Sequence, residues 1–462
     1  MLVPFQPDPV PGEPVTEPRP LGSGRDRPLV LLTHANHLYS DRKQVRKMQP
    51  YPPLQTLIAA AALRCAGVEV AFFDATFDWD IDSALDRVGP DILAVCEDNF
   101  NFLTKMCLLQ NRELAFEMAR AATARGIPAL VNSSDAADHP DAYLQAGFSR
   151  VIRGELEAAL VETVRRWPQP VTPQPPIADL DELPSPAWDL LDIEPYRRAW
   201  KEAHGYFSMN LVGSRGCPYH CNWCAKPLYG DSYRHHSAGR MAAEMECVKD
   251  LFHPDQIWFA DDIFGLSAKW TREFASRVVE RQAHIPFRMQ SRCDLMTRDT
   301  VEALARAGCV EVWMGAESGS QRILDAMEKG IYVEQIRQAR ENLRRHGIRA
   351  CMFLQFGYLG EEWEDIESTI RLVRETRPDD IGVSVSYPMP NTRFHRIVNA
   401  QLVAKKNWSD SGDLARMFQG QLPAEFYRAL ADALHLEVAQ SASNDDLGHA
   451  WEKVENLRCA CC

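Results

Sequence analysis

Residues 214–224, SRGCPYHCNWC, place three cysteines at the spacing C-x3-C-x2-C directly after the apolar run SMNLVG (208–213). Three thiolates so close together suit a soft metal centre, because a single loop can wrap it. A structural zinc site usually has a fourth Cys or His at similar spacing, and His220 inside the loop keeps a Cys3His zinc site open as an alternative. An iron–sulfur cubane held by only three cysteines instead leaves one iron available to a small ligand.

A series of β/α units surrounds this loop, between about residues 206 and 390. Helical patterns separate six strand-like runs, which are SMNLVG, QIWFAD, FRMQSR, VEVWMG, ACMFLQF and IGVSVSY. Such a series predicts parallel strands in a barrel or partial barrel, with the chemistry at the carboxyl ends of the strands. The cysteine loop follows the first run and therefore lies at that end.

The preceding part of the chain alternates in the same way. Its strand-like runs are PLVLLTH, VEVAFFDAT, DILAVCED, IPALVNSS and FSRVIRG, and its helical runs include PPLQTLIAAAALRCAG and ELEAALVETVRRW. This alternation predicts a doubly wound α/β sheet that binds ligands at the carboxyl ends of its strands. An α/β domain without a ligand is the alternative.

The whole chain is therefore predicted to be α/β, with a Rossmann-like doubly wound domain, a partial (β/α)6 barrel and a small helical C-terminal region. The segment between the two domains is too Pro-rich for regular structure and is predicted to be a linker. Its apolar residues Leu180, Leu183 and Trp188 predict that it is pinned to a domain surface. The expected segments are a disordered Pro-rich lead-in (1–27), the first domain (28–167), the linker (168–200), the barrel (201–398) and the helical region with a Cys-rich tail (399–462).

Composition narrows the class of protein. The chain has 462 residues, 45% of them hydrophobic, and a net charge of −13, which argues against nucleic-acid or anionic-membrane partners. No apolar run is long enough to span a membrane. The start, MLVPFQPDPVPGEPVTEPRP, lacks the features of a secretory signal, and the 13 unevenly spaced cysteines fit reduced thiols or metal ligands. A cytoplasmic location is the expectation.

The cysteine spacing within a six-fold β/α series resembles the radical S-adenosylmethionine (SAM) superfamily. This resemblance implies that Cys217, Cys221 and Cys224 hold a 4Fe-4S cluster. The fourth iron of that family's cluster chelates the amino and carboxylate groups of SAM. Electron transfer then splits the sulfonium and releases a 5′-deoxyadenosyl radical, so a reductant such as flavodoxin or ferredoxin is also implied.

Two segments resemble the family's second and third strands, which contact the methionine part of SAM. In IWFADDIF (257–264), Asp261 and Asp262 are candidates to accept hydrogen bonds from the SAM ammonium, and capping of the next helix is the alternative. In SRCD (291–294), Arg292 is the candidate to meet the SAM carboxylate.

Two further segments resemble the fourth and fifth strands. VWMGAESGS (312–320) implies ribose or methionine contacts by Glu317 and Ser318. FLQFGYLGE (353–361) implies that backbone beside Gly357 approaches the adenine, since glycine permits close approach. Together these segments extend the resemblance over residues 206–398.

The first domain resembles that of the cobalamin-binding subgroup of this superfamily. The likeness rests on the segments from PPLQTLI to FFDAT and from VIRGELE to ETV. Cobalamin is thereby implied as a further cofactor, with Ser133 and Ser134 as candidates to hydrogen-bond its tail. The D-x-H-x-x-G segment that supplies a cobalt ligand in many cobalamin proteins is absent; His34 and His37 occupy that loop with a different spacing.

That subgroup includes methyltransferases and relatives of the anaerobic magnesium-protoporphyrin ester cyclase. The resemblance favours cobalamin-dependent methylation of an unactivated carbon of a small molecule. A cyclase or rearrangement enzyme without net methyl transfer is one alternative, and a non-catalytic cobalamin or iron–sulfur sensor is another. The tail cysteines Cys459, Cys461 and Cys462 are candidates for an auxiliary cluster or a redox role, or have no function.

Overall fold

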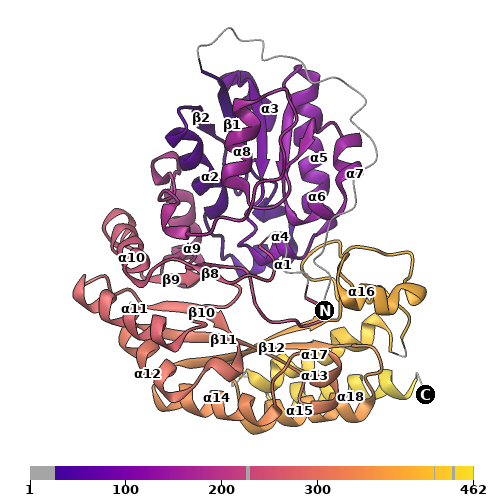
Figure 1. Cartoon of the computed structure of the whole chain (residues 1–462). Coiled ribbons are helices and arrows are strands. Elements are labelled where there is room, and N and C mark those ends of the chain that lie inside the picture. The colour runs from indigo at the N-terminus through magenta and orange to yellow at the C-terminus, as the bar shows by residue number, and fades with distance from the viewer. Residues whose placement is uncertain (1–26, 225–228, 421, 440–442, 461–462) are drawn as a thin grey trace, which may run out of the picture.

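The computed structural model describes residues 27–224, 229–420, 422–439 and 443–460. It divides into an upper domain and a lower domain in the view of Figure 1. Nearly all of the predicted lead-in (1–27) and the tail residues Cys461 and Cys462 lie outside the described residues.

The upper domain is a five-stranded parallel sheet in the order β2-β1-β3-β4-β5. Because neighbours β1 and β3 connect in opposite directions across the sheet, a topological switch point lies between their carboxyl ends. Helices α2 and α8 pack on one face and α3 and α5 on the other, each pair over its own apolar core. The elements are β1 Leu29–Thr33, α1 Arg42–Lys47, α2 Leu54–Cys65, β2 Glu69–Phe72, α3 Ile81–Val88, β3 Ile92–Cys96, α4 Phe102–Lys105, α5 Leu109–Ala124, β4 Ala129–Asn132, α6 Ser134–Asp138, α7 Pro140–Gln145, β5 Arg150–Val151 and α8 Leu156–Arg165.

The lower domain is a six-stranded parallel sheet whose strands follow one another in chain order, β13-β12-β11-β10-β9-β6. Strands β6 and β13 form its two edges, so the barrel is partial, as predicted. Figure 1 shows its helices on the outer, lower face of the sheet. The elements are β6 Ser208–Leu211, α10 Ala238–Phe252, β9 Gln256–Phe259, α11 Ala268–Glu280, β10 Phe287–Ser291, α12 Arg298–Ala307, β11 Cys309–Glu317, α13 Gln321–Ala326, α14 Val333–Arg345, β12 Arg349–Phe356, α15 Trp363–Thr376 and β13 Asp380–Val385.

The segment between the domains differs in part from its prediction. Leu180, Leu183 and Trp188 are buried, which confirms that the linker is pinned. Its last part is helical, however, since α9 spans Glu194–His204. The helix tolerates Pro195 because a proline in the first turn lacks an N–H that would in any case have no helical partner.

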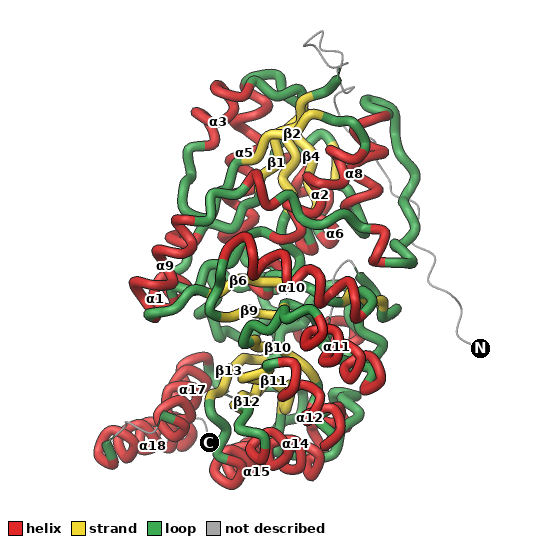
Figure 2. The backbone as a smooth tube through the Cα atoms, turned by 90° about the vertical axis from the view of Figure 1, so that its left-hand side faces the viewer, coloured by secondary structure: helices red, strands yellow, loops and turns green. Residues whose placement is uncertain are grey.

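The C-terminal region (399–462) contains the helices α17 Ala424–Val438 and α18 Asn444–Cys459, as predicted, and the short helix α16 Arg393–Val398 directly precedes it. Figure 2 shows α17 and α18 side by side next to the barrel. The segment between α16 and α17 reaches back to the upper domain, where the Leu109 N–H donates to the Trp408 carbonyl at 2.9 Å. No helix among the described residues is long and apolar enough to span a bilayer.

Candidate metal and cofactor site

The three predicted metal ligands lie on one hairpin at the carboxyl end of β6. Its strands are β7 (Ser214–Arg215) and β8 (Arg234–His235), which pair antiparallel. The chain enters the loop through Gly216, where φ is +80° and a Cβ would lie 2.1 Å from the Ser232 carbonyl oxygen. Only glycine fits this turn. Cys217, Cys221 and Cys224 are all half-buried.

The cysteine loop supplies three thiol groups, the donors that an iron–sulfur cluster requires, but these groups are not arranged as a converged metal site. Among the described residues, which include all three cysteines, no three His, Cys, Asp or Glu side chains converge as a metal-binding group. Cys221 lies close enough to Arg292 and Lys329 to contribute to raising the pKa of both side chains. Two positively charged side chains therefore lie beside the Cys221 thiol. His220, the zinc alternative, is exposed on this loop.

Asn222 anchors the cysteine loop to the rest of the barrel. Its backbone N–H donates to the Met327 carbonyl at 3.0 Å, and its Nδ2 donates to the Ala326 carbonyl at 2.7 Å. Its Oδ1 accepts from the Tyr358 hydroxyl at 3.0 Å, and its carbonyl accepts from the Phe394 N–H at 2.9 Å. Sequence reasoning missed this residue, because a single Asn in a loop carries no distinguishing pattern.

Asp261 holds the start of the cysteine loop. Its carboxylate accepts from the Gly213 N–H at 3.0 Å and from Ser214 Oγ at 2.5 Å. Burial raises the pKa of Asp261 to about 6. The alternative role, capping of the next helix, belongs to Ser267, whose side chain accepts from the Trp270 N–H. Asp261 therefore links β9 to the cysteine hairpin.

Asp262 instead faces the upper domain. Its Oδ1 lies 2.5 Å from Lys105 Nζ, at the end of α4. The two side chains keep 25% and 17% of their surfaces exposed, so water reaches this ion pair. The two adjacent aspartates thus have different surroundings.

Arg292 lies directly against the cysteine loop. Its guanidinium stacks on the Tyr219 ring, with Cζ 3.6 Å from the ring centroid. Its Nε donates to Asp294 Oδ1 at 2.9 Å, and Nη2 donates to the Lys329 carbonyl at 3.0 Å. Nη2 also donates to Asp294 Oδ2 at 3.3 Å, so the Asp294 carboxylate and the Tyr219 ring hold the guanidinium in place.

Glu317 forms a buried ion pair with Lys329, whose Nζ lies 2.7 Å from Oε1. The side chains are only 7% and 8% exposed. Glu317 has a φ of +61°, and the register between β11 and β12 shifts here. Positive φ in a non-glycine residue is a strained conformation that concentrates at functional sites. Sequence reasoning identified Glu317 but missed Lys329, which lies beyond α13.

Ser318 and Gly357 lie at the carboxyl ends of β11 and β12, at the same edge of the barrel sheet as Glu317. Ser318 Oγ lies 3.2 Å from Thr369 Oγ1 of α15. The Gly357 N–H donates to Glu361 Oε2 at 2.6 Å, and its φ is +70°. Burial raises the pKa of Glu361 to about 8. Both candidates therefore bond to α15 or the turn before it.

The two candidate serines of the upper domain are buried at the carboxyl end of β4. Ser133 Oγ caps α6 by accepting from the Ala136 N–H at 2.9 Å. Ser134 donates to Asn99 Oδ1 from both its N–H, at 3.1 Å, and its Oγ, at 3.0 Å. Asn99, which follows β3, also donates to Gln55 Oε1 at 3.0 Å. The serines belong to a buried polar network.

Several polar atoms at this edge have no hydrogen-bond partner within the described part of the chain. They include Thr33 Oγ1, Gln55 Nε2 and Glu97 Oε2. Burial raises the pKa of Glu97 to about 7. Buried polar groups are normally hydrogen-bonded, so these atoms fit a polar ligand such as the cobalamin tail.

The histidines after β1 are already engaged. His34 Nε2 lies 3.1 Å from Asp74 Oδ1, and His34 is 1% exposed. His37 Nδ1 lies 2.8 Å from the Ala75 carbonyl oxygen. These contacts orient both rings within the upper domain.

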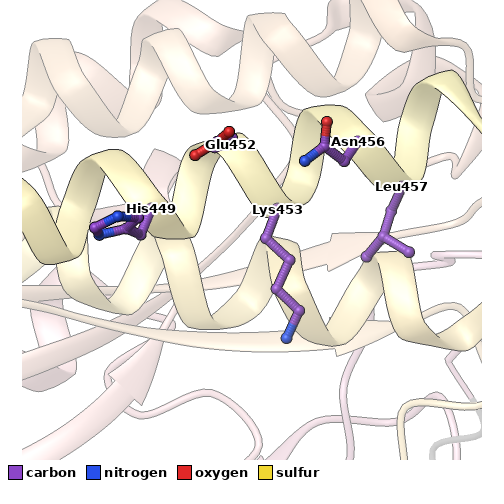
Figure 3. Close-up of a pocket in the computed structure, with 5 residues that line it drawn as sticks. All are labelled: His449, Glu452, Lys453, Asn456 and Leu457. Carbon is purple, nitrogen blue, oxygen red and sulfur yellow. The ribbon is translucent and has the colours of Figure 1, made fainter.

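The carboxyl edges of the two sheets meet at the cysteine hairpin. The Tyr229 hydroxyl on the hairpin donates to Gln55 Oε1 at 2.9 Å. The Tyr229 and Phe100 rings stack with centroids 5.3 Å apart. A shallow depression along α18, by contrast, is lined only by residues of that helix (Figure 3): His449, Glu452, Lys453, Asn456 and Leu457.

The barrel and its cysteine hairpin match a known protein family. The model of the radical SAM superfamily matches residues 211–373, from the end of β6 through the cysteine hairpin into α15. This chain carries a radical SAM domain. An uncharacterized methyltransferase of Pyrococcus horikoshii is 29% identical over 261 residues, 56% of this chain and 55% of the relative. The chain thus spans about half the length of that relative.

Two solved structures share the fold of both domains. The radical SAM methyltransferase TsrM from Kitasatospora setae, solved with cobalamin and a 4Fe-4S cluster, aligns with a TM-score of 0.65 at 18% identity, over 81% of this chain and 75% of TsrM. The cobalamin-dependent radical SAM enzyme OxsB aligns with a TM-score of 0.68 at 16% identity, over 94% of this chain and 72% of OxsB. The predicted order of a doubly wound α/β domain followed by a partial barrel is confirmed as a fold.

Proposed function

We propose that this protein is a cobalamin-dependent radical SAM enzyme that methylates an unactivated carbon of a small molecule. One observation carries the proposal: the cysteine hairpin at the carboxyl end of β6 faces the ligand-binding edge of the upper sheet, across the Tyr229–Gln55 contact. A radical generated at one edge is then next to a methyl carrier at the other. Neither edge alone provides both functions.

The residues of the barrel edge have distinct roles in this proposal. Cys217, Cys221 and Cys224 hold a 4Fe-4S cluster, which supplies the electron that cleaves SAM. Arg292 is oriented by Tyr219 to receive the SAM carboxylate. Its neighbours, including the Glu317–Lys329 pair, are suited to hold the nucleotide against the cluster loop.

The upper edge is suited to hold cobalamin, whose cobalt carries the transferred methyl group when bound. The unpartnered atoms of Thr33, Gln55 and Glu97 support a polar ligand there. Ser133 and Ser134 lie at the same edge but take part in protein hydrogen bonds. The proposal further includes a reductant such as flavodoxin or ferredoxin, a cytoplasmic location and no nucleic-acid partner.

The experiment uses full-length protein, reconstituted anaerobically with iron and sulfide and given SAM, a chemical reductant and hydroxocobalamin. We expect 5′-deoxyadenosine, because radical SAM cleavage proceeds slowly without substrate. We also expect S-adenosylhomocysteine in an amount limited by the bound corrinoid, because transfer of a methyl group from SAM to the carrier yields it. Both products are measured by chromatography.

The product pattern separates the candidate functions. 5′-Deoxyadenosine alone would indicate a radical SAM enzyme without methyl transfer, such as a cyclase. The absence of both products would favour a sensor and would contradict the proposal. The Cys221→Ala variant is the control for adventitious iron, and omission of hydroxocobalamin is the control for the methyl carrier.

A further inference from the structure

A buried group of four charges joins the upper domain to the base of the cysteine hairpin. Arg215 of β7 donates from Nη2 to Glu157 Oε1 at 2.6 Å and from Nη1 to Glu155 Oε2 at 3.1 Å. Arg234 of β8 forms an ion pair with Glu155. The hairpin supplies both arginines, one from each strand, and the upper domain supplies both glutamates.

This group is almost completely removed from water. The Arg215, Glu155 and Glu157 side chains are 2%, 4% and 2% exposed, and Arg234 is 12% exposed. Two positive and two negative charges cancel. Such a network is costly to bury and does not by itself stabilise a fold beyond what apolar residues would, so its retention calls for a specific role.

The surroundings fix the guanidinium of Arg215 further. Its Cζ lies 5.5 Å from the centroid of the Phe100 ring and 5.2 Å from that of Tyr229. Phe100 comes from the upper domain and Tyr229 from the hairpin. Both domains therefore contact the side chain of Arg215, which lies two residues before Cys217.

The glutamates lie at the carboxyl edge of the upper sheet. Glu155 directly precedes α8, and Glu157 lies in its first turn, shortly after β5. Glu155 Oε2 also accepts from the Ile177 N–H at 3.2 Å. The edge suited to cobalamin and the loop suited to the cluster are thus mechanically joined.

We propose that Glu155 and Glu157 are positioning residues for the cysteine loop, acting through Arg215 and Arg234. The upper domain then sets the placement of the cluster ligands as well as offering a cofactor site. The experiment on cluster loss rests on the proposed function, because it needs a bound cluster. The ion-pair network itself does not depend on that function.

The test compares two glutamates that receive the same substitution. Glu157→Gln removes one charge from the hairpin network. Glu311→Gln is the matched control, because Glu311 is also buried and paired with arginines, Arg288 and Arg349, but lies at the amino end of β11. After anaerobic reconstitution, the visible absorption of the cluster is followed during exposure to an iron chelator. We expect Glu157→Gln to lose its cluster about tenfold faster than the unmodified protein, and the control to lose it at the unmodified rate.

A second variant separates positioning from the effect of an unpaired buried charge. Glu157→Met combined with Arg215→Met removes both charges and should restore the unfolding temperature, since apolar pairs replace buried ion pairs well. We expect cluster loss to remain fast in this double variant. Restoration of the unmodified rate in this double variant would overturn the proposal. Cluster loss in Glu311→Gln as fast as in Glu157→Gln, or cluster loss in Glu157→Gln at the unmodified rate, would overturn it as well.

Amide hydrogen exchange of residues 214–217 provides a readout that needs no cluster. We expect exchange at least about tenfold faster in the Glu157→Met/Arg215→Met variant, because opening of the hairpin then separates only the Arg234–Glu155 pair and no longer the Arg215 pairs. If the unmodified protein binds no cluster, the proposed function fails, yet exchange still tests positioning. Unchanged exchange would refute the positioning role alone.

Discussion

The carboxylates beside the cysteine loop and those at the upper sheet edge have different partners. At the barrel edge, Asp261 accepts hydrogen bonds from the loop that it holds, and Glu317 pairs with Lys329. At the upper edge, Glu97 and Gln55 each have a buried polar atom with no partner among the residues that the structure describes. The two carboxylates beside the cysteine loop are thus held by protein donors, although Glu361 Oε1 and Trp223 Nε1 elsewhere at the barrel edge also lack a partner among the described residues. The upper edge has the pattern expected of a site that a polar ligand completes.

The largest expected effect comes from the cysteine loop itself. Cys221→Ala should reduce SAM cleavage to background, because a cluster with only two protein ligands does not stay bound. The production of 5′-deoxyadenosine measures this. Cys247→Ala is the control, since Cys247 is also half-buried but lies on α10. Retained cleavage in Cys221→Ala would contradict the ligand assignment.

The buried pair beside the loop should give the largest loss of stability. Lys329→Met leaves the Glu317 carboxylate buried and uncompensated, which should lower the free energy of unfolding by about 3–5 kcal/mol. Adding Glu317→Gln removes the unpaired charge and should recover much of that loss. Urea denaturation of all three proteins measures both steps. If the double variant is no more stable than Lys329→Met, the two side chains are not coupled.

The upper edge should reveal itself through the pH dependence of stability. The pKa of Glu97 is about 7 in the folded protein against an ordinary 4.5, so the folded state binds the proton more tightly than the unfolded chain. The free energy of unfolding should therefore fall as pH rises from about 4.5 through about 7, by on the order of 3 kcal/mol from this group.

Glu97→Gln isolates this contribution. Asp98 and Asp261, whose pKa values burial raises to about 6, titrate in the same range, so only the difference between variant and unmodified protein is informative. We expect the two stability curves to diverge as pH rises through this range. The exposed Glu113→Gln variant should follow the unmodified protein. Parallel curves for Glu97→Gln would mean that water already satisfies Glu97 Oε2.

The parts that sequence reasoning predicted and missed follow a physical rule. Strands β6 and β9 to β13 were predictable because buried parallel strands are continuous apolar runs, and the cysteine spacing is local. Helix α3 was not predicted, since its pattern is only eight residues long and half of these residues are polar. Asn222 and Glu157 escaped notice because their partners lie more than fifty residues away. Lys329 escaped notice because its pairing with Glu317 depends on the irregular turn and the short helix between them. Side-chain pairing across domains is set by tertiary packing alone.

The smallest loss of stability is expected at the Lys105–Asp262 ion pair, which joins the two domains and is partly exposed to water. Lys105→Met removes the partner of Asp262 with the same substitution as Lys329→Met. Because both side chains of this ion pair keep part of their surface exposed, the Asp262 carboxylate stays hydrated, and the loss should not exceed about 1 kcal/mol. Urea denaturation under the same conditions compares the two methionine variants directly. A loss as large as that of Lys329→Met would mean that the Lys105 side of the interface is closed to water. The contrast between the buried Glu317–Lys329 pair and the partly hydrated Asp262–Lys105 pair would then have to be abandoned.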